Sequence, residues 1–324
     1  MKDKKWPLPV FIVLLLFLLP SITGHNYYVL HVANICCIFT ILAMGLNMLQ
    51  GYTGLVSIGQ AGFYAIGAYI SGLLAVKLGL PFLICLFIGA LVASIVGLAL
   101  GLTTVRLYGG YLALVTVGFG RIIQLIAINW VEMTGGGEGL LGIPPAKLGT
   151  VVLTPEQFYY FALLVTVILF VITVNLVNSK IGRALIAIRE QRIAANMMGI
   201  DVAGYRLIAF VIAACYSGIA GGLYAFFAGS LFPDYFSLPQ SIIILIMVIL
   251  GGAGTLYGPI IGAVLVTIGF EFLRPLQSYQ MIIYGFGVVL VVMFMPYGIV
   301  GVARHLLQIM QGDRKGSETG VARG

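Results

Sequence analysis

Long apolar runs fill the chain and are separated by short clusters of polar residues, glycine and proline. Breaking the chain at these clusters gives ten candidate spans, at about 7–24, 29–50, 60–79, 81–105, 110–130, 157–178, 206–229, 237–252, 255–273 and 278–296. A helix needs roughly 20 apolar residues to cross a bilayer core. Runs such as 158–177 are apolar on every face, whereas a barrel strand would alternate. The pattern predicts an all-α, polytopic helical transmembrane bundle of about ten spans.

Composition supports a lipid environment. Of the 324 residues, 61% are hydrophobic and only 8% are charged, which is far from the balance of soluble domains. We therefore expect one transmembrane domain, 1–324, in contact with the lipid bilayer. The four cysteines lie in apolar segments without metal-ligand spacing, so they are interpreted as buried small hydrophobes. No metal or other cofactor is expected.

We attribute the net charge of +7 to the orientation of the chain in the membrane and not to a nucleic-acid partner, since no basic patch with interleaved aromatic residues occurs. With the Lys-rich N-terminus inside, most of the 17 Lys and Arg residues fall in cytoplasmic segments. Both termini are then cytoplasmic, with a loop at 179–206 and a tail from about 303. Residues 1–24 resemble both a signal peptide and a membrane helix, and the poor cleavage site favours a retained helix.

Several glycines are spaced four residues apart, a spacing that lets helices approach closely. They are Gly97 and Gly101, Gly218 and Gly222, and Gly254, Gly258 and Gly262. We interpret them as packing seams. A pore does not follow from this spacing alone.

The segment from Gly51 to Gln60 is too rich in glycine and polar residues for a lipid-facing helix. Irregular backbone at membrane depth is tolerated only where it is buried in protein or lines a cavity. We expect a broken or re-entrant segment, with a tight cytoplasmic turn as the alternative. Polar side chains here are candidates to line a translocation path. They are Asn47, Gln50, Ser57 and Gln60.

An external loop runs from Val131 to Glu156 and carries Thr134, Gly136 and Glu138. Loops of this length usually have a function. Docking of a substrate-delivery protein is one interpretation, and a flexible connector is the other.

The only long cytoplasmic loop has helical character, because 183–198 contains no proline or glycine. Its apolar stripe comprises Ile186, Ile193, Met197 and Ile200, while Gly199 provides a stop. An amphipathic helix of this kind lies on a lipid surface or inserts into a groove of another protein. Periodicity does not decide between these two.

Six short patterns occur in an order that resembles one family of permeases. They are Gly45-Leu46-Asn47 with Gly51-Tyr52, 63–69, Tyr111-Leu112-Ala113 with Gly118-Phe119-Gly120, Thr134-Gly135-Gly136, 182–200, and Gly251-Gly252 with Gly254 to Pro259. The resemblance covers about residues 30–300. It is to the permease subunits of ATP-binding-cassette (ABC) importers, and within them to the branched-chain amino-acid, Liv-type family.

The resemblance implies an importer of leucine, isoleucine and valine in the bacterial cytoplasmic membrane. Its implied partners are a homologous permease subunit, two cytoplasmic ATPase subunits, an extracytoplasmic solute-binding protein and the small-molecule substrate. The chain would be a transport subunit and not an enzyme, and ATP hydrolysis would come from the separate ATPase subunits, because the chain has no phosphate-binding G-x-x-x-x-G-K-[ST] loop. The same machine carrying urea or a short amide is the alternative.

The resemblance also assigns the cytoplasmic loop as the segment that couples to the ATPases. The coupling residues it implies are Gly182, Arg183, Arg189, Glu190, Ala194, Ala195 and Gly199.

Arg121 departs from the family pattern, in which an acidic residue is common at this position. A charge within a span is costly and suggests a function. Arg121 is therefore a candidate for the translocation path, where it would meet a substrate carboxylate or an internal acid. The alternative is a side chain that snorkels or binds a helix-end carbonyl.

Two other classes fit less well. An ion-coupled carrier would need acidic residues or broken-helix ion sites at mid-membrane depth, and Asp234 and Glu271 lie near external ends instead. A membrane enzyme would need a nucleophile with a base, or paired acids, and the three histidines stand beside none.

Overall fold

The computed structural model describes residues 26–104, 107, 109–149, 151–273 and 285. Within them, six helices are long and apolar enough to cross a membrane. They are α2 (Tyr27–Leu46, continued by a π-helix, η1, Asn47–Gly51), α3 (Gln60–Leu78), α4 (Phe82–Thr104), α5 (Gly110–Asn129), α7 (Pro155–Asn178) and α10 (Val202–Ala228). Two shorter apolar helices follow, α11 (Leu238–Gly251) and α12 (Gly258–Phe272).

Eight of the ten predicted spans therefore coincide with helices, with boundaries displaced by at most a few residues. The predicted spans 7–24 and 278–296, and the tail from about 303, lie outside the described residues. The helical membrane bundle is confirmed.

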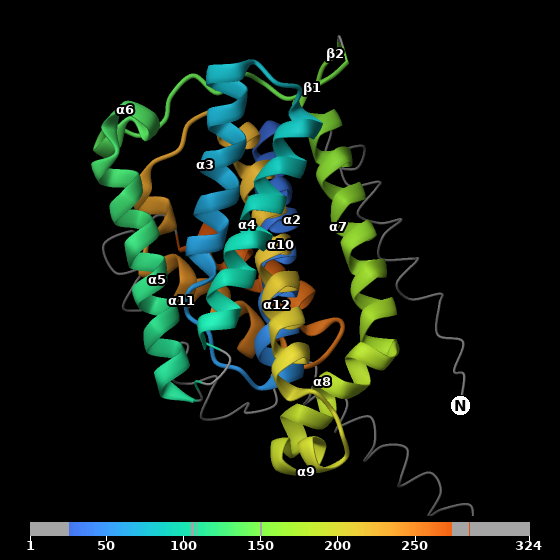
Figure 1. Ribbon diagram of the computed structural model, residues 1–324. Helices are drawn as coiled ribbons and strands as arrows, with labels where there is room; N and C mark the ends of the chain where they lie inside the picture. The colour runs from blue at the N-terminus through green and yellow to red at the C-terminus, as the bar shows by residue number, and fades with distance from the viewer. Residues whose placement is uncertain (1–25, 105–106, 108, 150, 274–284, 286–324) are drawn as a thin grey trace, which may run out of the picture.

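Helix α10 is the centre of the bundle and packs against α2, α3 and α4 (Figure 1). Helices α5 and α7 flank this centre on opposite sides, and α11 and α12 pack on each other and on α2. The small elements α6 (Val131–Thr134), β1 (Lys147–Leu148) and β2 (Val151–Val152) lie at one end, while α8 (Lys180–Glu190) and α9 (Arg192–Met197) lie at the other. The predicted external loop and the predicted cytoplasmic loop are thus at opposite ends.

The end that carries α6 is held by short backbone pairings. Strands β1 and β2 pair antiparallel, with Lys147 opposite Val152, and an isolated bridge joins Leu140 to Leu231. Short 3-10 helices complete it, η2 (Gly136–Glu138) and η3 (Pro233–Phe236). Helix α7 starts here with a capping box, in which Thr154 and Gln157 satisfy each other's backbone amides.

The four-residue glycine spacing serves helix packing as predicted, except at Gly254, which lies at φ +78° in the turn between α11 and α12. A Cβ on Gly97 would collide with Ala214, one on Gly101 would lie 2.7 Å from Leu207, and one on Gly218 would lie 2.8 Å from the Cα of Ala90. Helices α4 and α10 therefore meet almost backbone to backbone. In the same way, Gly262 of α12 leaves room for the carbonyl of Met247 in α11.

The cysteine prediction also holds in outline. Cys37 and Cys85 are buried, Cys36 and Cys215 are half-buried, and all four are free thiols.

One prediction was wrong in detail. The cytoplasmic loop is not one uninterrupted helix over 183–198, because the chain bends at Gln191, whose φ and ψ are −150° and 98°. Helix α9 then folds back so that Ala195 packs with Ile188 and Val202. The predicted stripe is consequently split, with Ile200 against this small core and Ile193 and Met197 exposed. Gly199 ends the segment at φ +80°, as predicted.

Glycine packing in the α11–α12 pair gives a testable expectation. Gly262→Val forces branched atoms against the Met247 carbonyl, whereas Gly269→Val on the same helix meets open space. Overpacking of this kind costs about 1–3 kcal/mol. We expect Gly262→Val to lower the apparent Tm of the detergent-purified chain by several degrees and Gly269→Val to leave it unchanged. Equal midpoints for the two variants would contradict the packing seam.

Candidate functional site

The predicted broken segment is present and partly buried. After η1 the chain leaves the helix over Gly54–Gly59 before α3 begins; Leu55, Ser57 and Gly59 are buried, whereas Gly54 and Val56 are exposed. The amide of Ile58 donates to Thr116 Oγ1 of α5 at 3.0 Å, and Gly59 lies against the Thr116 carbonyl. These contacts satisfy irregular backbone without water. A part of the segment is therefore held by other helices, which favours the broken segment over a simple tight turn.

Two of the predicted polar side chains on this segment are completely buried. Gln60 donates from Nε2 to Ser217 Oγ at 2.5 Å and to the Ala213 carbonyl at 3.3 Å, both on α10. Among the described residues, the buried atoms Gln60 Oε1, Ser57 Oγ and Gln50 Oε1 have no hydrogen-bond partner. Buried polar atoms are nearly always paired, with protein, water or ligand. Three unpaired buried oxygens in one place show that the interior beside the broken segment is polar.

Asn47 plays a different part from its neighbours. Its Nδ2 donates to the Thr255 carbonyl at 3.0 Å, and its Oδ1 accepts from the Gly254 amide at 2.8 Å. The side chain thus binds the end of α2 to the turn between α11 and α12. Asn47 is a structural cross-link in this conformation.

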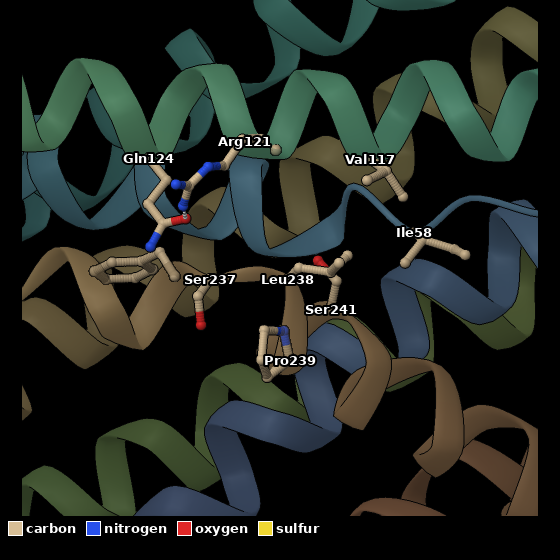
Figure 2. Close-up of a pocket in the computed structure, with 10 residues that line it drawn as sticks. Ile58, Val117, Arg121, Gln124, Ser237, Leu238, Pro239 and Ser241 are labelled. Carbon is tan, nitrogen blue, oxygen red and sulfur yellow. Dashed lines mark hydrogen bonds between the residues drawn. The ribbon is translucent and has the colours of Figure 1, made fainter. Parts of the chain in front are cut away.

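A cavity of about 230 Å³ lies between α5, the broken segment and the start of α11 (Figure 2). It is lined by Ile58, Val117, Gly120, Arg121, Gln124, Phe236, Ser237, Leu238, Pro239 and Ser241. Arg121 stands near the middle of α5, and the N-terminus of α11 reaches the cavity beside it. The cavity therefore joins two segments that the sequence separates by more than a hundred residues.

The two ends of this cavity differ in chemistry. Arg121 donates from Nη1 to Gln124 Oε1 at 2.6 Å, and both side chains lie at one end, opposite Ser237 (Figure 2). Ile58 and Val117 lie at the other end. The first turn of α11 adds the positive end of a helix dipole. This arrangement suits a small ligand that has an anionic group and an apolar body.

The outer surface of α8 and α9 carries exposed apolar and charged side chains. Ile193 is 74% exposed and Met197 is 81% exposed, and Arg183, Glu190, Ala194 and Gly199 are exposed beside them. Exposed apolar side chains gathered on a short helix are typical of an interaction site.

Of the other predicted coupling residues, two are buried and Arg189 is exposed but bonded to the bundle. Gly182 lets α8 approach the Val177 carbonyl at the end of α7, and Ala195 is buried in the small core. Arg189 reaches back into the bundle, where its Nη1 donates to the Gly51 carbonyl at 2.5 Å. The coupling set therefore comprises exposed residues, the buried Gly182 and Ala195, and Arg189, which is exposed yet contacts the bundle.

The residues of the predicted external loop also divide. Thr134 is buried, and its hydroxyl donates to the Ala127 carbonyl at 2.6 Å and accepts from the Gly136 amide at 3.3 Å. Gly136 is likewise buried, whereas Glu138 is exposed. Thr134 and Gly136 shape the loop, and only Glu138 offers a side chain to a partner.

Sequence reasoning missed the residues that surround Arg121. Gln124 lies one helical turn from Arg121 and could have been found from that spacing. Ser237 and Ser241 lie on a distant segment, and no local pattern marks them. A second cavity of about 250 Å³, between α2, α11 and α12, holds none of the predicted path residues.

The fold and these sites define a polytopic membrane permease. A family model described as branched-chain amino acid transport system / permease component matches residues 28–295, and the chain belongs to this family. It is thus the permease component of an ABC transport system, not itself an ATPase. The resemblance seen in the sequence is confirmed.

Individual relatives agree with this assignment. The chain is 35% identical to the high-affinity branched-chain amino acid transport system permease protein LivM of Salmonella typhimurium, over 89% of this chain and 73% of that protein. It is 34% identical to LivM of Escherichia coli K12 over the same shares, and 24% identical to LivH of that organism over 81% of this chain and 91% of LivH. No solved structure matches the chain.

Proposed function

We propose that this chain pairs with a homologous permease to form the membrane path of an ATP-driven importer for leucine, isoleucine and valine. Two cytoplasmic ATPases and an extracytoplasmic solute-binding protein complete the machine, in a bacterial cytoplasmic membrane with both termini of the chain in the cytoplasm. Support for a paired permease comes from the similarity to both LivM and LivH, two permeases of one organism.

The observation that carries the substrate class is the cavity at Arg121. A branched-chain amino acid has a carboxylate and an aliphatic side chain, and the cavity offers Arg121 with the start of α11 for the first and Ile58, Val117 and Leu238 for the second. In this proposal the cavity is a stopping place on the path. Ser57 and Gln60, with unpaired buried oxygens, extend the path along the broken segment.

The exposed face of α8 and α9 docks the ATPase subunits in this proposal. Ile193 and Met197 insert into a groove of the ATPase, and Glu190 pairs with a cation at its rim. Glu138, at the opposite end of the bundle, is available to the solute-binding protein.

The proposal is tested by uptake into proteoliposomes that contain this chain, its partner permease, both ATPases and the binding protein. We expect ATP-dependent accumulation of labelled leucine and none of labelled urea. Urea uptake alone would keep the mechanism and overturn the substrate. Gradient-driven transport without the ATPases would contradict an ABC importer altogether.

Arg121 gives a sharper expectation within the same assay. Arg121→Gln removes the cation of the cavity, and a hydrogen bond to a charged group is worth about 1.5–3 kcal/mol, or roughly 10–100-fold in affinity. We expect leucine uptake to fall by at least about tenfold, with partial recovery in Arg121→Lys. Lys77→Gln, which removes an external charge outside the cavity lining, serves as the control. Wild-type uptake by Arg121→Gln would exclude a carboxylate contact.

Glu190 tests the docking face. Glu190→Lys reverses the charge at the exposed end of α8, and we expect the ATPase subunits to be lost during purification of the complex. Lys180→Glu reverses a charge at the exposed start of the same helix and should retain them. If Glu190→Lys keeps both the ATPases and full uptake, α8 does not dock through this residue.

A further inference from the structure

Arg189 makes a contact that a residue used only for ATPase docking would not make. Its helix lies at the predicted cytoplasmic end of the bundle, yet its guanidinium turns inward and donates to the Gly51 carbonyl, the last residue of η1. We propose that Arg189 is the positioning residue that transmits movement of α8 to the broken segment and, through it, to the Arg121 cavity. This inference rests on the proposed function and assigns the internal half of its coupling mechanism.

The Gly51 carbonyl is free to accept this bond because the helix stops there. In a continued α-helix it would accept from the amide of Leu55, four residues later. That amide instead approaches Thr53 Oγ1, at 3.3 Å. The backbone at the end of η1 thus leaves an acceptor facing α8, and Arg189 occupies it.

Three glycines lie around the arginine, and Gly254 is the one that makes room for its guanidinium. A Cβ on Gly54 would lie 3.5 Å from Arg189 Cγ, and one on Gly254 would collide with the guanidinium. Gly51 itself sits so close to the Gly254 amide that a side chain would not fit. Three segments, η1, the broken segment and the α11–α12 turn, therefore meet around one side chain from α8.

The contact continues toward the cavity along two routes. The segment that starts at Gly54 ends at Ile58, which lines the cavity. The α11–α12 turn, held to α2 by Asn47, leads back through α11 to Ser237 and Ser241, which also line it. In this proposal, a shift of α8 moves both the Ile58 side and the Ser237–Ser241 side of the cavity relative to Arg121.

The experiment reads the cavity directly and does not require substrate. In the full complex in lipid nanodiscs, with Cys36, Cys37, Cys85 and Cys215 replaced by serine or alanine, Ile58→Cys reports access to the cavity. Its labelling rate by a soluble maleimide is measured without nucleotide and after trapping with ATP and vanadate. With Arg189 present, we expect the two rates to differ by at least about threefold.

Arg189→Met keeps the length of the stem and removes the donors. We expect its two labelling rates to become equal, while the ATPases still co-purify and hydrolyse ATP within about twofold of the wild-type rate. Arg189→Lys keeps a donor and should retain at least half of the response. Lys180→Met, which removes a cation from the exposed start of α8, should retain all of it.

An unchanged response in Arg189→Met would overturn the inference. Loss of the ATPases from that variant would overturn it too, because Arg189 would then be a docking contact. If Arg189→Met does not assemble, Arg189→Gln decides by the same ratio of rates. Leucine uptake plays no part in this readout, so a failure of the proposed substrate leaves the result intact.

Discussion

The structure depends on one constraint, which is that a backbone amide inside a bilayer must find its partner within the protein. Regular helices meet it by themselves, and the chain uses them nearly everywhere. Where the helix is abandoned, at Gly54–Gly59, other elements supply the partners, as Thr116 does for the amide of Ile58. The cavity forms next to this exception, because Ile58, whose amide is bonded to Thr116, also lines the cavity.

Much of the fold follows from hydrophobic pattern, because a membrane span is a long signal and membrane thickness fixes its length. The described helices therefore match the predicted ones. The bend at Gln191 was not predicted, because neither proline nor glycine marks it. It arises from tertiary packing, since Ala195 gains a place beside Ile188 and Val202 only if the helix turns back.

The candidate site was predictable only in part. Arg121 was predicted because it is a charge within an apolar span, and Ser57 and Gln60 were predicted because they are polar residues in a glycine-rich segment. Their surroundings were not predictable, because Ser237 and Ser241 approach through long-range packing that no local spacing records. Arg189 illustrates the same limit. Its membership of a cytoplasmic pattern suggested an outward role, whereas its contact with Gly51 joins positions 138 residues apart.

The near backbone contact between α4 and α10 has a mechanical consequence. Gly97 and Gly218 contribute no side chain of their own, so at these two positions no long side chain can change rotamer to absorb a small displacement. Helices α4 and α10 therefore move together as one rigid unit. Relative movement takes place where irregular backbone or long side chains lie between this unit and the segments around the cavity.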